Sequence, residues 1–182
     1  NDILAEKKEI RRKVKQLKMN LSEDQRQKAE DLIIAQLLAD EHISSSKVIA
    51  AYWSLPDEMP THRLIEQLVS VGHDVYLPVI DGETLNFRKY EGADSLSEEK
   101  RFGIPEPHYG SLMPTDVTFP IIVPGIAFTS DGCRLGRGGG FYDHFIEQKS
   151  DSYKIGIAFY CQIFSSLPTD VFDIRMDKVI WG

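Results

Sequence analysis

The chain carries at residues 132–143 the stretch Gly132-Cys133-Arg134-Leu135-Gly136-Arg137-Gly138-Gly139-Gly140-Phe141-Tyr142-Asp143, which contains five glycines and two arginines. Glycines cluster in this way where a backbone adopts positive φ angles or approaches a ligand closely. Phe141, Phe145 and Ile146 are apolar at helical spacing, so we expect a helix directly after the glycines. Upstream, the apolar residues 119–123 predict a buried strand. A strand, a glycine loop and a helix N-terminus together predict an anion site in an α/β fold.

The glycine loop, residues 136–140, differs from two familiar phosphate-binding motifs. No Gly-Lys-Ser/Thr ends it, and no Gly-x-Gly-x-x-Gly follows the strand directly. A glycine-rich surface turn is the alternative, but Arg134 and Arg137 favour a polyphosphate, because guanidinium groups bind phosphate oxygens through a planar fork of donors. Asp143 either complements the helix dipole or holds a hard cation such as Mg²⁺, and the residues alone leave both interpretations open.

Composition limits the class of protein. The 182 residues suit one domain spanning 1–182, and 42% hydrophobic with 27% charged residues is ordinary for a globular chain. No apolar run reaches the ~18 residues of a membrane span and no secretory signal is present, so we expect a cytoplasmic protein without a membrane partner. Cys133 and Cys161 are expected to be free thiols. The net charge of −7 argues against nucleic acid as a partner, and we expect a monomer.

Alternating apolar and amphipathic segments predict a mainly parallel central sheet with helices on both faces, a Rossmann-like three-layer α/β arrangement. Ser22 and Gln25 have the spacing of a capping box, and residues 42–47 are expected to form a polar connection. The expected helices are 3–18, 22–40, 61–71 and the segment after Gly140, and the expected strands are 48–53, 74–80, 119–123 and 154–159, with 85–90 as a further candidate. Ligands in such folds bind beyond the carboxyl ends of strands, so residues 53–58, the glycine loop and residues 159–162 are expected to converge.

The first expected helix is strongly basic. Its residues Lys7 and Arg11 lie four positions apart and therefore share one face. That face either is solvated or directs two cations at a bound anion, and the helix by itself favours the first interpretation.

Residues 134–143, preceded by VPGIAF at 123–128, resemble the signature of the 5-formyltetrahydrofolate cyclo-ligase family, also called methenyltetrahydrofolate synthetases. The resemblance extends over nearly the whole chain, through Lys7, Arg11, Asp57-Glu58, Thr61, Leu77-Pro78, Gly103-Ile104, Glu106-Pro107, Gln162, Asp173 and Asp177. It implies a single-domain α/β enzyme that uses ATP and Mg²⁺ to close 5-formyltetrahydrofolate into 5,10-methenyltetrahydrofolate, releasing ADP and phosphate.

The resemblance also implies roles for particular residues. It assigns the ATP phosphates to Lys7, Arg11, Arg134, Leu135, Gly136, Arg137, Gly138, Gly139, Gly140, Phe141 and Tyr142. It assigns Mg²⁺ to Asp143 and Asp177. It assigns the pterin to Glu58, with Trp53, Leu55, Phe102 and Tyr142 as walls for the folate ring system. Arg137, on the transferring phosphate, and Lys7 are the expected catalytic cations.

In the implied reaction ATP phosphorylates the formyl oxygen, and the neighbouring folate amine then attacks the activated carbon. Such a transfer depends on positioning and charge stabilisation rather than on a protein nucleophile. The chain indeed lacks a Gly-x-Ser-x-Gly elbow. A nucleotide-binding regulatory module without a reaction and a small-molecule kinase are the alternative functions. Glu58 taken alone is more typical of a solvated loop acid than of a pterin ligand.

Overall fold

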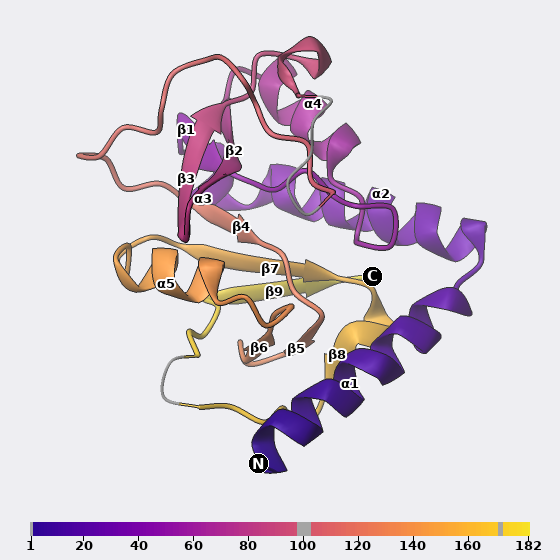
Figure 1. The fold of residues 1–182 in the computed structure, drawn as a ribbon. Coiled ribbons are helices and arrows are strands. Elements are labelled where there is room, and N and C mark those ends of the chain that lie inside the picture. The colour runs from indigo at the N-terminus through magenta and orange to yellow at the C-terminus, as the bar shows by residue number, and fades with distance from the viewer. Residues whose placement is uncertain (1, 98–102, 171–172) are drawn as a thin grey trace.

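The computed structural model describes residues 2–97, 103–170 and 173–182 (Figure 1). Its main sheet has the strand order β3-β2-β1-β4-β7-β9. The strands are β1 (Val48–Ala50), β2 (Asp74–Asp81), β3 (Thr84–Lys89), β4 (Ile121–Val123), β7 (Lys154–Ala158) and β9 (Lys178–Trp181). All neighbouring pairs are parallel except β2 with β3, which forms the antiparallel edge. The predicted mainly parallel sheet is therefore confirmed.

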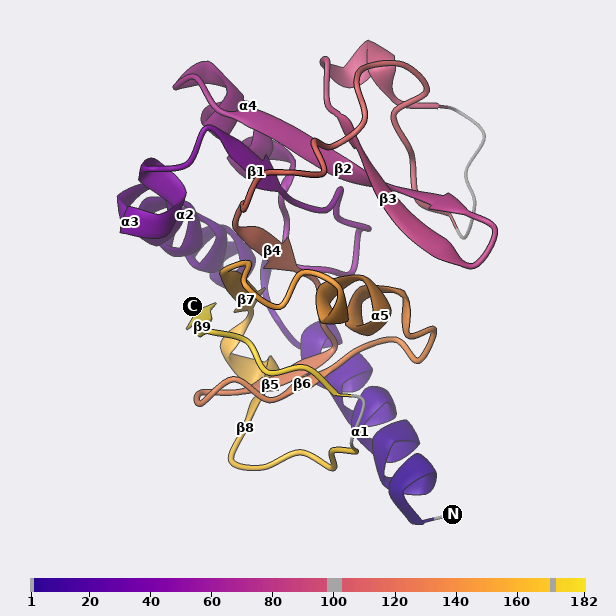
Figure 2. The same ribbon diagram turned by 90° about the vertical axis from the view of Figure 1, so that its left-hand side faces the viewer.

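Helices cover both faces of this sheet, as the sequence predicted. The helices α2 (Glu23–Ala39) and α4 (His62–Ser70) pack Leu37 and Leu64 against Ile49 of β1 in one core cluster. On the opposite face α5 (Phe141–Glu147) packs Ile146 against Ile121 of β4. Figure 2 shows α5 and α2 on opposite sides of β4 and β7. The central strands β1 and β4 are consequently shielded from water on both sides, which explains why all of their residues are apolar.

Local signals decide where two of the helices begin. Ser22 accepts a hydrogen bond from the Gln25 amide, and the Gln25 side chain accepts one from the Ser22 amide, which confirms the capping box before α2. The expected polar connection at 42–47 is partly wrong, because the short helix α3 (Glu41–Ser44) lies there. The Asp40 carboxylate accepts hydrogen bonds from the amides of His42 and Ile43 and so caps this extra turn.

A second, smaller sheet separates β4 from the glycine loop. Its order is β6-β5-β8, formed by Ala127–Thr129 (β5), Arg134–Leu135 (β6) and Ile163–Phe164 (β8). The strand expected to lead directly into the glycines is therefore followed first by a β5–β6 hairpin. The helix α1 (Asp2–Met19) packs Val14 on Ala127 and Leu135 of this sheet, and Figures 1 and 2 show it beside β5 and β8. This packing places the basic helix next to the start of the glycine loop.

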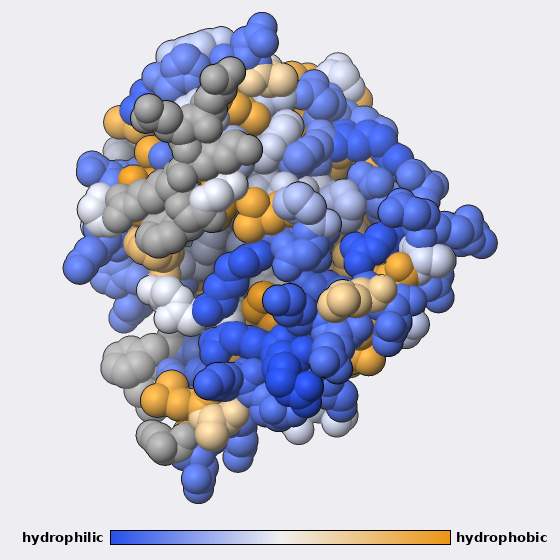
Figure 3. Space-filling model, turned by 45° about the vertical axis from the view of Figure 1, so that its right-hand side comes forward, coloured by the Kyte–Doolittle hydropathy of each residue, from blue (hydrophilic) through white to orange (hydrophobic). Residues whose placement is uncertain are grey.

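The remaining described elements are two short 3₁₀ turns, η1 (Ala93–Ser95) and η2 (Tyr160–Gln162). On the face shown in Figure 3 hydrophilic residues cover most of the surface, and hydrophobic residues form separate small patches. Within the described ranges no helix is both long enough and apolar enough to cross a membrane.

Candidate active site

A cavity of about 800 Å³ lies at the carboxyl ends of β1 and β4. Its lining brings together α1, the segment after β1, the edge of β2 and β3, the glycine loop and the first turns of α5. The predicted convergence of residues 53–58 with the glycine loop is confirmed by this lining. Residues 159–162 do not line the cavity. Instead, the Gln162 side-chain amide donates hydrogen bonds to the carbonyls of Gly125, which does line it, and of Ile126.

The glycine loop connects β6 to α5 with backbone angles that suit glycine. Gly138 has φ +108° and Gly140, the residue before α5, has φ +75° with left-handed geometry. Residues with side chains rarely adopt these angles, so the glycines let the chain turn sharply into the helix. The expected glycine loop followed by a helix N-terminus is confirmed.

Arg134 forms the floor of the loop. Its buried Nε donates a hydrogen bond to the Pro124 carbonyl at 2.7 Å, and Nη1 lies 3.3 Å from Oδ1 of Asp143. Burial lowers the pKa of Arg134, against the opposing influence of Asp143. Burial likewise raises the pKa of Asp143, and the negative charge of Asp173 adds to the effect. The pair fixes the first turn of α5 relative to β4.

Two cations of α1 line the cavity, Arg11 at the glycine loop and Lys7 at two aspartates. Arg11 donates from Nε to the Gly136 carbonyl at 2.9 Å. Lys7 is only 8% exposed, and its Nζ lies 3.1 Å from Asp170 and 3.3 Å from Asp173. Burial alone would lower the pKa of Lys7, but hydrogen bonds and charges from these aspartates raise it above its ordinary value. The solvated-face alternative is therefore excluded for Lys7.

The acidic residues near the end of the chain divide between the cavity and a separate ion pair. Asp173 lines the cavity together with Asp143. Asp177 does not line it, because its carboxylate accepts the Lys154 amide at 2.8 Å and pairs with Lys154 Nζ at 3.2 Å. The structure thus brings Asp143 together with Asp173 and not with Asp177. Asp170, Asp173 and Asp177 lie in a segment without helical or strand periodicity. The sequence therefore did not indicate which of them faces the cavity.

Glu58 lies across the cavity from α1. Its side chain is 13% exposed, its Oε1 accepts the Leu55 amide at 2.8 Å, and its Oε2 lies 3.6 Å from Nη2 of Arg137. Burial raises the pKa of Glu58, while the hydrogen bond from Leu55 and the charge of Arg137 oppose that rise. A loop acid that is enclosed and paired in this way is not the solvated residue that the sequence alone favoured.

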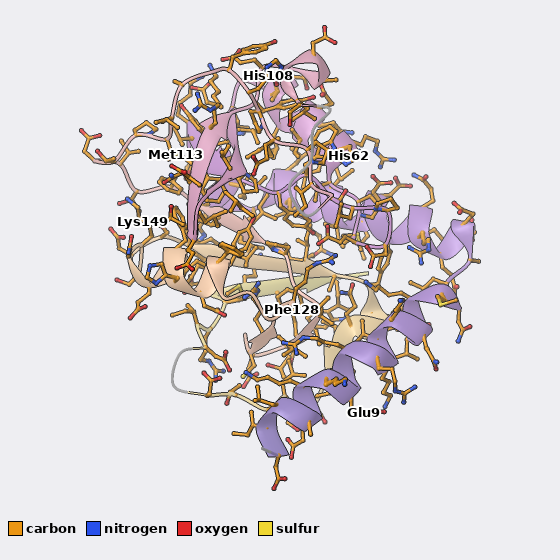
Figure 4. All side chains as sticks on the ribbon, in the orientation of Figure 1. Glu9, His62, His108, Met113, Phe128 and Lys149 are labelled. Atoms are coloured by element: carbon orange, nitrogen blue, oxygen red, sulfur yellow. The ribbon has the colours of Figure 1, made fainter. Side chains whose placement is uncertain are left out.

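Apolar side chains form the wall around Glu58. Trp53 stacks on His62 with ring centroids 3.7 Å apart, and His62, labelled in Figure 4, begins α4. The lining also contains Tyr52, Leu55, Pro78, Ile80, Leu85 and Ile104. Tyr52, Pro78, Ile80, Leu85 and Ile104 were not assigned as site residues from the sequence, since an apolar residue directed at a cavity looks like any core residue. Phe102, predicted as part of this wall, lies outside the described residues.

Two further polar groups belong to the wall. Glu106, which also lines the cavity, accepts the Ile80 amide at 2.7 Å and so fastens the 103–107 loop to β2. Tyr142 packs edge-on to Phe87, and its buried hydroxyl has no hydrogen-bond partner among the described residues. The cavity therefore has a cationic side with paired acids and an apolar side that contains the carboxylates of Glu58 and Glu106.

Comparison with known proteins gives a consistent match. A model of the 5-formyltetrahydrofolate cyclo-ligase family matches residues 3–182. The 5-formyltetrahydrofolate cyclo-ligase of Haemophilus influenzae is 32% identical over 181 residues, covering 96% of each chain, and that of Mus musculus is 27% identical over 188 residues, covering 96% of this chain and 93% of the mouse protein.

Two solved structures share the fold. The Aquifex aeolicus 5,10-methenyltetrahydrofolate synthetase has a TM-score of 0.84 at 32% identity and covers 96% of this chain and 89% of its own. The synthetase of Mycoplasma pneumoniae, at 23% identity, has a TM-score of 0.75 with 96% and 97% covered. The chain therefore belongs to the 5-formyltetrahydrofolate cyclo-ligase family and is an ATP-dependent ligase of folate metabolism.

Proposed function

We propose that the cavity performs the family's reaction by holding ATP on its α1 and glycine-loop side and folate on its β1–β3 side. The reaction converts 5-formyltetrahydrofolate into 5,10-methenyltetrahydrofolate while ATP becomes ADP and phosphate. The observation that best supports this arrangement is the ion pair between Nη2 of Arg137 and Oε2 of Glu58, which lie 3.6 Å apart. This approach puts a phosphate-binding cation and the acid proposed for the pterin at one junction.

The nucleotide side rests on clustered cations. Lys7, Arg11, Arg134 and Arg137 all line the cavity. Each guanidinium offers a fork of donors to phosphate oxygens, and the left-handed glycines allow the backbone of residues 134–142 to approach them closely. Arg134, which is buried and already bonded to Pro124 and Asp143, frames the loop. Arg137 is proposed to contact the transferring phosphoryl group, and Lys7 is proposed to contact the remaining phosphates.

The proposed Mg²⁺ ligands are Asp143 and Asp173. The residues fit this ion, because both carboxylates line the cavity and the charge of Asp173 raises the pKa of Asp143, a repulsion that a divalent cation relieves. Mg²⁺ commonly takes one or two carboxylates and completes its shell with water and phosphate oxygens. When bound, the ion neutralises charge that develops on the phosphates. Asp177, engaged with Lys154, is not proposed as a ligand.

The folate side combines a carboxylate with flat apolar walls. A pterin presents adjacent N–H donors that the Glu58 carboxylate can accept in bidentate fashion. Trp53, supported from behind by His62, offers a ring face to the cavity, and Leu55 and Tyr142 complete the wall. The ~800 Å³ volume falls within the range of small-molecule sites, which is about 300–1,000 Å³.

The chemistry then needs little from the protein beyond placement. The formyl oxygen attacks the γ-phosphorus and the bond to the ADP oxygen breaks. The neighbouring folate amine next bonds to the formyl carbon and loses its proton, and the carbon–oxygen bond breaks as phosphate leaves. Arg137 follows the charge on the transferring group, Lys7 neutralises the remaining phosphates, and Glu58 fixes the pterin so that the amine faces the carbon.

A coupled assay tests this proposal. Purified protein, 5-formyltetrahydrofolate and Mg-ATP are expected to produce the near-ultraviolet absorbance of the methenyl product together with equal amounts of ADP. ADP without the chromophore would point to a small-molecule kinase, and ATP binding without turnover would point to a regulatory module.

The proposal extends to a monomer that works in the cytoplasm. Cys133 and Cys161 are free thiols, which are typical of proteins in reducing compartments. Light scattering of the purified protein tests the monomer. A dimer mass at micromolar concentration would contradict it.

A further inference from the structure

Asp57 occupies a bridging position that the proposed function does not use. Its Oδ1 lies 3.6 Å from Nη2 of Arg137 in the glycine loop, and its Oδ2 lies 3.6 Å from Nζ of Lys18 in α1. Asp57 itself follows β1 and is 60% exposed at its side chain. One carboxylate of the segment after β1 therefore pairs with two other segments that line the cavity, α1 and the glycine loop.

Arg137 has two acidic partners with different surroundings. Glu58 lines the cavity at 13% side-chain exposure, whereas Asp57 does not line it. A ligand in the cavity can therefore compete with Arg137 for Glu58 but not for Asp57. When pterin donors occupy Glu58, Asp57 is the partner that still holds the guanidinium at the junction, because both acids contact the same Nη2.

The contact with α1 anchors Asp57 from the other side. The Lys18 side chain is only 5% exposed, and a buried ammonium is stable only with a paired acid or hydrogen-bond acceptors. This fixes Asp57 against α1, the helix that also carries Lys7 and Arg11. A displacement of Arg137 is thus resisted by an acid that is tied to the nucleotide-binding helix.

We propose that Asp57 is a positioning residue that keeps Arg137 aimed at the phosphates while folate occupies Glu58, and that it thereby couples folate binding to ATP binding. The inference rests on the proposed function, since it needs folate at Glu58 and phosphate at Arg137. Folate releases Arg137 from Glu58, and Asp57 then holds the guanidinium where it faces the phosphates. ATP is therefore expected to bind more tightly once folate is bound.

The experiment measures the dissociation constant of a non-hydrolysable ATP analogue with Mg²⁺, with and without saturating 5-formyltetrahydrofolate. The wild-type protein is expected to bind the analogue about fivefold more tightly with folate, a modest coupling for linked sites. In Asp57→Asn the ratio of the dissociation constants measured without and with folate is expected to fall close to one. Turnover is expected to fall about tenfold, because Arg137 then loses its remaining acidic partner when folate binds. Asp57→Glu is expected to restore most of the ratio.

Two controls separate positioning from stability. Asp57→Asn leaves the Lys18 ammonium without its acid, so the double variant Lys18→Met/Asp57→Asn is measured as well, and its ratio is also expected to be close to one. Asp131→Asn removes a still more exposed acid, 71% against 60% for Asp57, that pairs with Arg175, and it is expected to keep the wild-type ratio. A merely structural Asp57 would lower the melting temperature and leave the ratio unchanged.

The outcomes are distinct. A wild-type ratio in Asp57→Asn or in the double variant overturns the inference, and so does a ratio near one in the wild-type protein that turns over. Failure of the wild-type protein to form the methenyl product overturns the proposed function instead, whatever the Asp57 variants do.

Discussion

Replacing Glu58 by glutamine tests the folate side of the cavity most directly. The substitution keeps the shape of the side chain and an oxygen that can accept the Leu55 amide, but it removes the charge that faces Arg137. A hydrogen bond to a charged group contributes about 1.5–3 kcal/mol. Since each 1.4 kcal/mol corresponds to about tenfold in affinity, Glu58→Gln is expected to weaken 5-formyltetrahydrofolate binding by about 10- to 100-fold.

The same substitution is expected to leave the folded protein at least as stable at neutral pH. Burial raises the pKa of Glu58 above its unfolded value, so ionisation of this carboxyl disfavours the folded state. This destabilisation is absent below the pKa that Glu58 has in the unfolded chain. It grows as the pH rises through the higher pKa that Glu58 has in the folded protein. Glutamine removes it, while the lost pair with the half-exposed Arg137 contributes at most about 1 kcal/mol. The melting temperature of Glu58→Gln is therefore expected to equal or exceed that of the wild-type protein.

Isothermal titration calorimetry of each substrate separates these effects. Folate affinity is expected to fall while the affinity for a non-hydrolysable ATP analogue does not fall, because the ATP cations remain in place and Arg137 is released from the charge of Glu58. The wild-type folate affinity is also expected to decrease on acidification, beginning at a higher pH than for an ordinary glutamate, and Glu58→Gln should lack this dependence. Glu91→Gln, at an acid paired with Lys89 outside the cavity, is the matched control. Unchanged folate affinity in Glu58→Gln would refute the role.

Four further substitutions address the remaining assignments. Arg137→Ala is expected to keep the fold and to lower turnover at least tenfold, about 1.4 kcal/mol of transition-state stabilisation, and full turnover at saturating ATP would disprove the phosphate contact. Asp173→Asn is expected to raise the Mg²⁺ concentration needed for half-maximal turnover by about tenfold, whereas Asp177→Asn should leave it unchanged, and the reverse order would reinstate Asp177 as the ligand. His62→Ala is expected to raise the KM for folate about threefold at constant kcat, since Trp53 loses its stacking support of about 0.5–1 kcal/mol, and an unaltered KM would exclude that support.

Much of the fold follows from local patterns in the sequence. The continuous apolar run at 48–53 predicted a buried parallel strand, and Ser22 with Gln25 predicted the start of α2. The meeting of Glu58 with the glycine loop followed from topology alone, because parallel strands end at one edge of the sheet. These signals depend on near neighbours or on a general rule of α/β folds.

The missed features depend on contacts between distant segments. The strand β6 has only two residues, Arg134 and Leu135, and is defined by its pairing with β5. A periodic pattern in the sequence could therefore not predict it. Asp173 and Asp177 are four residues apart and chemically identical. Only the tertiary path of the chain directs one to Lys7 and the other to Lys154.

The cavity cations already have acceptors within the protein, and this has a consequence for selectivity. Lys7 faces two aspartates, Arg11 a carbonyl, Arg134 a carbonyl and Asp143, and Arg137 two acids. A lone orthophosphate or sulfate would have to displace these acceptors while engaging few cations at once. A chain of three phosphates reaches several cations together, and each bond it makes offsets one that is broken. If the cations hold ATP as proposed, orthophosphate and sulfate are expected to inhibit the enzyme only at high concentration.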